Sequence, residues 1–350
     1  MAGKKVYPRL ARAEVIKAVE RKNPSRVPLS FAKWWGEGLH EQYGQRLGEF
    51  DRFPEDTVWV GVAPLDVGRM NLSWKIEGGK AYDSNLVISD WSQLDEFIDK
   101  LPLTAAEAQN EAYETMAVHA ANLRKQDVYI HFGWWNLFFE RPWGLRGMEN
   151  LMLDYHLYPE EIHRLHDAMA DLYIGHIRRA AREFAPDGFW TSDDLGHQTG
   201  LMMGPEIFRD LIKPYYVKVG KALKESRMHW WLHSCGDNTE IMGDLAEAGV
   251  DVFHPVQKHT MDEVKIARQY GGQMTFLAGF DVQHILQEAT PEGVREEVRL
   301  LIDTFDRPEG GLCIAAGNGI VRGTPFENIE AFLEEALEYG TAHRQGYKAR

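Results

Sequence analysis

The chain has 350 residues, of which 44% are hydrophobic and 26% are charged, values typical of a globular protein and not of a disordered or membrane-embedded one. Its formal net charge of −14 disfavours nucleic acids and anionic membranes as partners, and no run of about 18 apolar residues could span a bilayer. The N-terminus lacks the continuous apolar stretch of a secretory signal, so a cytoplasmic location is expected.

Helices and strands are predicted along the whole chain, beginning with a helix over 9–22. Apolar runs bounded by turn residues predict strands near residues 29, 59, 130, 190, 231, 252, 276 and 314. After the second of these, short alternating segments around Gly78-Gly79 predict a β-hairpin insertion within 71–88. Helical spacing predicts further helices over 92–100, 105–125, 148–155, 159–184, 205–224, 238–248, 261–270, 282–287, 291–305 and 325–339. Pro214 predicts a break within the helix over 205–224.

The alternation of strands and helices favours an α/β fold of the (β/α)8 TIM barrel type. A doubly wound sheet is disfavoured because no Gly-x-Gly-x-x-Gly turn follows the first strand. No low-complexity linker divides the chain, so residues 1–350 are expected to form one domain. A barrel of this type places its active site at the C-terminal ends of the strands. The side chains expected there are Lys33, Trp35, Asp66, Trp134, Asp193, Asp194, His197, His233, Cys235, His254, Gln257, Asp281 and Asn318.

One pair of these residues, His233 and Cys235, has the chemistry of a metal site. Alternate side chains of an extended strand share a face, so an imidazole and a thiolate two residues apart reach the same point. This donor pair suits Zn²⁺. A buried, unliganded cysteine is the alternative, because His-x-Cys is a short pattern. With Cys235 and Cys313 as its two cysteines, the chain has no disulfide framework.

Motifs from Arg9 to Tyr339 resemble those of the uroporphyrinogen decarboxylase superfamily, whose fold is a (β/α)8 barrel. The motifs that carry the resemblance are Arg26-Val27-Pro28, Asp193-Asp194-Leu195-Gly196, Lys213-Pro214-Tyr215, His233-Ser234-Cys235-Gly236, Gly249-Val250-Asp251, Gly279-Phe280-Asp281 and Gly317-Asn318-Gly319-Ile320. This superfamily contains porphyrinogen decarboxylases, which need no metal, and zinc-dependent methyltransferases, which work with corrinoid proteins.

The resemblance favours the methyltransferase branch. Decarboxylases grip the acidic side chains of a tetrapyrrole with an arginine-rich loop after the first strand, whereas the segment 32–37 of this chain contains no arginine. Methyltransferases bind zinc through His-x-Cys and a distal cysteine. His233 and Cys235 match the first part, but Asn318 stands where the distal cysteine is expected, and Cys313 lies five residues earlier. The third ligand is therefore Cys313 or another group, with Asp193, Asp194, His254 and Asp281 as candidates.

The resemblance implies transfer of a methyl group between a small substrate and the corrinoid of a partner protein, with Zn²⁺ as Lewis acid. The pairs Trp34-Trp35 and Trp134-Trp135 favour a flat aromatic methyl ether as donor, although such pairs also pack barrels. The predicted roles are catalytic for Asp193, Asp194 and Asn318, substrate-binding for Lys33, Trp35, Trp134, His254 and Gln257, and zinc-binding for His233, Cys235 and Cys313. The alternatives are a metal-independent decarboxylase and a non-catalytic ligand-binding barrel.

Overall fold

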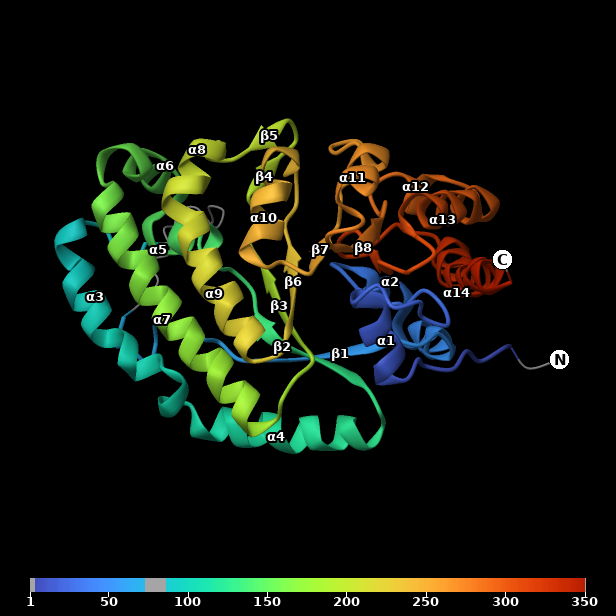
Figure 1. Cartoon of the computed structure of the whole chain (residues 1–350), viewed down its shortest axis with the longest axis horizontal. Coiled ribbons are helices and arrows are strands. Elements are labelled where there is room, and N and C mark those ends of the chain that lie inside the picture. Colours follow the sequence, from blue (N-terminus) through green and yellow to red (C-terminus); the bar gives the residue numbers. More distant parts are fainter. Residues whose placement is uncertain (1–3, 73–85, 350) are drawn as a thin grey trace. The chain divides into compact units, whose positions relative to one another are not determined.

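The structure is a computed structural model that describes residues 4–72 and 86–349. The chain divides into two compact units (Figure 1). Unit 1 consists of Met1–Val58, Arg124–Tyr129 and Asp251–Arg350, and unit 2 consists of Trp59–Leu123 and Ile130–Val250. The β-hairpin predicted within 71–88 falls mainly outside the described residues. The expectation of one domain over 1–350 stays a prediction.

Unit 2 is built on parallel strands whose side chains are mostly buried. In spatial order its strands are β1 (Thr57–Gly61), which begins at the end of unit 1, β2 (Tyr129–Trp134), β3 (Gly188–Ser192) and β6 (His229–His233). The pairs β2–β3 and β3–β6 are parallel. Strands buried on both faces read as continuous apolar runs, which is why periodicity of two was absent from these segments.

Helices and a short hairpin complete unit 2. The helices are α3 (Leu94–Lys100), α4 (Asn110–Lys125), α5 (Glu140–Arg146), α6 (Met148–Leu157), α7 (Pro159–Glu183), α8 (Pro205–Ile207), α9 (Lys213–Glu225) and α10 (Met242–Ala248). Short 3-10 segments occur at Trp91–Gln93, Leu101–Thr104, Ala106–Ala108 and Thr239–Ile241. The antiparallel strands β4 (Gly196–His197) and β5 (Gly200–Leu201) form the hairpin. The long helix α7 packs beside α9 (Figure 1).

The backbones of β2 and β3 approach closely at Gly133. A Cβ atom built there would lie 1.8 Å from the carbonyl oxygen of Trp190, so no other residue fits without moving the strand. The predicted break at Pro214 is confirmed, because a π-helical turn, Phe208–Ile212, separates α8 from α9 and Pro214 lies in the first turn of α9.

Unit 1 has the same strand and helix alternation. Its strands are β7 (Val252–His254), β8 (Thr275–Phe280) and β9 (Leu312–Ala316), paired in parallel in that order. Its helices are α1 (Arg12–Val19), α2 (Leu39–Tyr43), α11 (Glu263–Tyr270), α12 (Ile285–Glu288), α13 (Pro291–Phe305) and α14 (Phe326–Lys348), with a 3-10 segment at Gly44–Arg52. Helices α13 and α14 pack side by side (Figure 1).

The first predicted strand, near residue 29, forms only an isolated parallel bridge between Leu29 and Ile314. The amide of Ile314 donates to Pro28 O and the amide of Ser30 donates to Ile314 O. The ladder stays short because Pro28 has no N–H to donate and Phe31 leaves the extended region with a φ of 56°. The other seven predicted strands are present, so the predicted (β/α)8 class is confirmed. No helix among the described residues is long and apolar enough to cross a membrane.

Candidate metal centre

The sheet of unit 2 brings three potential metal ligands together at the ends of two neighbouring strands. His233 is the last residue of β6 and is paired in register with Ser192, the last residue of β3. The amide of Asp193 donates to His233 O at 2.9 Å, which continues this pairing by one step. Asp194 therefore leaves β3 beside the loop that carries Cys235.

Two glycines hold the loops after β3 and β6 against each other. Gly236 has a φ of 80°, and a Cβ atom there would lie 2.2 Å from the carbonyl carbon of Gly196. The loop after β6 is further fixed by Asn238, whose Nδ2 atom donates to the carbonyl oxygens of Ser234, Cys235 and Gly236. The sequence motifs Asp-Asp-Leu-Gly and His-Ser-Cys-Gly thus end in glycine because their backbones touch.

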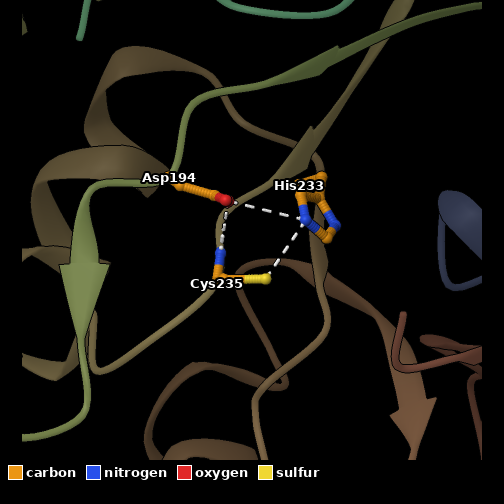
Figure 2. A group of neighbouring side chains, drawn as sticks. All are labelled: Asp194, His233 and Cys235. Atoms are coloured by element: carbon orange, nitrogen blue, oxygen red, sulfur yellow. Dashed lines mark hydrogen bonds and ion pairs between the residues drawn. The ribbon is translucent and has the colours of Figure 1, made fainter. Parts of the chain in front are cut away.

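Asp194, His233 and Cys235 direct one ligand atom each toward a common point (Figure 2). The Nε2 atom of His233 lies 3.3 Å from Cys235 Sγ and 3.5 Å from Asp194 Oδ1. Oδ1 also accepts a hydrogen bond from the amide of Cys235 at 2.8 Å. The three ligand atoms lie within 4.8 Å of one another, and this is the only such group found in the part of the chain that the structure describes.

The spacing fits a tetrahedral Zn²⁺ ion. With metal–ligand distances of about 2.0–2.3 Å, tetrahedral ligand atoms lie about 3.3–3.6 Å apart. The two distances to His233 Nε2 match this spacing. Burial lowers the pKa of His233, and this effect is larger than the opposite effect of the Asp194 charge, which raises it. The imidazole is therefore neutral at pH 7 and available as a ligand. The Asp194 side chain is 37% exposed, so the group is open on one side, as in catalytic zinc sites.

Asp193, next to Asp194, has a structural role in holding the neighbouring segment. Its fully buried carboxylate accepts hydrogen bonds from the amides of Phe138, Phe139 and Glu140 and from the hydroxyl of Tyr216. Burial raises the pKa of Asp193 to about 6, and these donors oppose the shift. The carboxylate thereby fixes the start of α5.

Two residues that were not among the predicted site residues lie beside the ligand group. The carboxyl of Glu140 accepts a hydrogen bond from Ser192 Oγ at 2.6 Å, and burial together with the charges of Asp194 and Asp193 raises its pKa to about 8. The ring of Trp135 meets the ring of His233 edge to face, with centroids 6.0 Å apart, and the side chain is 39% exposed. A signal for Trp135 existed in its pairing with Trp134.

The predicted substrate-binding residue Trp134 is buried in unit 2. It is 2% exposed, and its ring packs on Tyr173 of α7 and on Phe189 of β3. The indole therefore fills the space between sheet and helix, whereas the neighbouring Trp135 is exposed at the ligand group.

Of the other predicted site residues, Asp66 and His197 lie in unit 2 and the rest lie in unit 1. The Nζ atom of Lys33 donates to Phe53 O at 2.8 Å, and the ring of Trp35 packs on Phe50. His254 is buried, with Nε2 3.1 Å from Ala316 O. The half-buried Gln257 accepts backbone hydrogen bonds in the loop after β7, and the exposed Asn318 accepts one from the amide of Gly319 through Oδ1.

Cys313 lies inside β9 of unit 1 and is fully buried. Burial, with the nearby charges of Asp56 and Asp306, raises the pKa of its thiol well above the usual range. The group that the structure assembles from the predicted candidates contains Asp194 in the third position. The assignment of Cys313 as a zinc ligand stays a prediction.

The sequence profile described as "Uroporphyrinogen decarboxylase (URO-D)" matches residues 143–339, which is more than half of the chain. The chain belongs to the uroporphyrinogen decarboxylase family. The matched segment of this family member contains Asp194, His233 and Cys235 and all elements from α6 to α13.

Curated relatives of this family member are methyltransferases. It is 24% identical over 197 residues to a methylated-thiol--coenzyme M methyltransferase of Methanosarcina mazei, covering 55% of this chain and 49% of the relative. It is 28% identical over 138 residues to the methylcobamide:CoM methyltransferase MtbA of Methanosarcina acetivorans, covering 39% and 38%. The matches thus span half or less of the length of these relatives.

A solved structure has the same fold over nearly the whole chain. It is described as a methyltransferase from Methanosarcina mazei, and the match has a TM-score of 0.64 at 15% identity, covering 94% of this chain and 98% of that one. At this identity the match establishes the fold.

Proposed function

We propose that this protein is a methyltransferase that moves a methyl group between a small substrate and a corrinoid carried by a partner protein. The observation that carries the proposal is the convergence of His233 Nε2, Cys235 Sγ and Asp194 Oδ1, with the spacing of zinc ligands, in a member of a family whose curated relatives act on methylcobamides and methylated thiols.

Zn²⁺ would be held by His233, Cys235 and Asp194, in place of the Cys313 that the sequence suggested. When bound, zinc supplies Lewis acidity to the heteroatom of the substrate. Two of the three ligands are preset without metal, because Asp194 Oδ1 accepts the amide hydrogen of Cys235 and Asn238 fixes the loop that carries the thiol. A preset donor set costs little reorganisation on binding.

Glu140 is positioned to hold a proton next to this group. Burial, the largest cause, raises the pKa of Glu140 and so favours its protonated form, and the carboxyl hydrogen-bonds Ser192 at the end of β3. A neutral carboxylic acid beside the developing negative charge of a leaving oxygen or sulfur can donate a proton to it. Asp193 is assigned a positioning role, since each of its hydrogen bonds holds the segment that ends in Glu140 or the helix α9.

The exposed ring of Trp135, which lies beside the three candidate ligands, favours an aromatic methyl ether as the methyl donor. Trp135 is 39% exposed and meets His233 edge to face, so its indole offers a flat apolar surface next to the ligands. In this proposal Trp135 takes the substrate-binding role that was predicted for Trp134. A methylated thiol, which one curated relative uses by name, is the competing donor class.

The test measures zinc content and methyl transfer in the same preparations. Wild-type protein is expected to bind about one Zn²⁺ per chain at this group and to catalyse methylation of cob(I)alamin by an aryl methyl ether. His233→Ala and Cys235→Ala should lose this zinc and the activity. His119→Ala is the matched control, because His119 is an exposed histidine on α4 of the same unit.

Absence of zinc from this group after reconstitution would overturn the proposal and favour a metal-independent decarboxylase or a non-catalytic ligand-binding barrel. Zinc binding with transfer from methylated thiols alone would retain the methyltransferase and replace the donor class.

A further inference from the structure

A second set of metal-ligating side chains lies in unit 1, outside the group formed by Asp194, His233 and Cys235. His259 is in the loop after β7, Asp281 directly follows β8, and His284 directly precedes α12. Asp281 is the last residue of the sequence motif Gly279-Phe280-Asp281. Their placement at the ends of two paired strands brings them to one place.

The carboxylate of Asp281 is only half satisfied by hydrogen bonds. Its Oδ1 atom accepts from the amides of Gln283 and His284 at 2.8 and 3.0 Å, which fixes the side chain at the start of α12. Its Oδ2 atom is buried and has no hydrogen-bond partner among the described residues, and the side chain is 5% exposed. A buried, unsatisfied carboxylate oxygen is costly, and a cation is a partner that removes this cost.

His259 Nε2 is the group that faces this oxygen, at 3.6 Å. This distance is close to the roughly 3.4 Å that separates two nitrogen and oxygen ligands on a tetrahedral ion. The side chain of His259 is 62% exposed, so the imidazole is accessible to an ion from solvent.

His284 provides the third donor. Its ring and that of His259 meet edge to face with centroids 5.9 Å apart, while two imidazoles on one tetrahedral ion have centroids about 5 Å apart. Both side chains are exposed, so rotation about their side-chain torsions can close this difference without moving the backbone.

The surrounding charges favour a cation. Glu263 interacts electrostatically with His259, and its Oε1 atom is also buried without a hydrogen-bond partner in the described residues. Lys258 forms ion pairs with Glu263 and Glu297. Asp281, Glu263 and Glu297 are three acidic side chains at this place, against the one basic side chain of Lys258.

We propose that His259, Asp281 and His284 form a second divalent-cation site with a two-histidine, one-carboxylate donor set, suited to Zn²⁺, Co²⁺ or Ni²⁺. It contains no thiolate. Because it lacks a thiolate, this site has a different Co²⁺ absorption spectrum from the group that includes Cys235. Each site can therefore be tested whether or not the other binds metal.

The experiment uses Co²⁺ as the probe and the full chain carrying both His233→Ala and Cys235→Ala, so that the thiolate site is disabled. After removal of metals by a chelator, about one Co²⁺ per chain is expected to bind, with d–d absorption and without the charge-transfer band of a cobalt thiolate. Adding His259→Ala or His284→Ala should weaken Co²⁺ binding by more than about tenfold, since even outer partners of a metal site change affinity by 10–100-fold.

His40→Ala is the matched control, because His40 is an exposed histidine on α2 of the same unit. Both test substitutions replace exposed side chains, so folding should be retained, and far-UV circular dichroism checks this. The proposal is overturned if the double variant binds no Co²⁺ up to millimolar concentration, or if its Co²⁺ affinity is the same with and without His259 and His284.

Discussion

The amide of Cys235 donates a hydrogen bond to Asp194 Oδ1 at 2.8 Å, and this bond ties the segment after β3 to the loop after β6. The same oxygen lies 3.5 Å from His233 Nε2. One carboxylate oxygen therefore both orients the loop that carries the thiol and faces the imidazole. These two contributions can be separated by substitution.

Asp194→Ala is expected to lower the affinity for Zn²⁺ by about 100-fold, since it removes both a charged ligand and the acceptor for Cys235 N–H. Asp194→Asn keeps an acceptor for that amide but loses the charge, and should retain the loop while losing most of the affinity. Competition with a chromogenic chelator measures both. Asp237→Asn, which changes an acid of the same loop that caps Thr239, is the control. Wild-type affinity in Asp194→Asn would show that Asp194 orients the loop and is not a ligand.

Asp193→Ala is expected to destabilise the protein by about 3–5 kcal/mol, because it leaves two buried amides, one partly buried amide and one buried hydroxyl without their acceptor. Tyr216→Phe removes one of these four donors and should cost about 1 kcal/mol. The free energy of unfolding in urea measures both. Similar costs for the two variants would contradict the anchoring role of Asp193.

The strands and the convergence of His233 and Cys235 could be predicted from the sequence, because each depends on residues that are neighbours in the chain. Continuous apolar runs predicted seven strands correctly, and alternation along an extended segment predicted that His233 and Cys235 share a point in space. The weak first strand was misjudged because its pairing depends on Pro28 and on the backbone of Phe31, whose positive φ local sequence did not signal.

The identity of the third ligand, Asp194, depends on the register between β3 and β6, and this register could not be read from the sequence. Asp194 reaches the group because Ser192 pairs with His233, so the two motifs end side by side. The same register separates the roles of the two acidic residues: Asp193 turns into the core toward α5, and Asp194 faces the ligands. Sequence reasoning assigned the substrate-binding role to Trp134, because the sequence does not show that α7 covers this residue, whose ring packs on Tyr173.

Trp135→Ala is expected to raise the KM for an aryl methyl ether by about fivefold, corresponding to the loss of about 1 kcal/mol of ring stacking, with zinc content unchanged. Trp135→Phe should recover much of the loss. Trp59→Ala is the matched control, because Trp59 lies in β1 of the same sheet and is also 39% exposed. An equal KM in wild type and Trp135→Ala would argue against an aromatic donor stacked at this position.

Three buried histidines make the stability of unit 2 sensitive to acid. Burial lowers the pKa of His131 to about 3 and the pKa of His166 and of His176 to about 4. Between pH 6.5 and 4 the unfolded chain binds protons at these positions and the folded chain does not, so stability is present above pH 6.5 and is lost as the pH falls. Each histidine contributes at most about 1.4 kcal/mol per pH unit, so the three together give a slope of up to about 4 kcal/mol per unit.

His166→Asn tests this slope. Nδ1 of His166 lies 2.7 Å from Leu211 O, and the amide group of asparagine can make the same hydrogen bond without titrating. The variant should lose about one third of the dependence of the unfolding free energy on pH between pH 6 and 4.5, as measured by urea unfolding. His119→Asn, at an exposed histidine of α4, should keep the wild-type slope. Equal slopes for wild type and His166→Asn would mean that His166 binds a proton in the folded protein, and the acid sensitivity would then have to come from other groups.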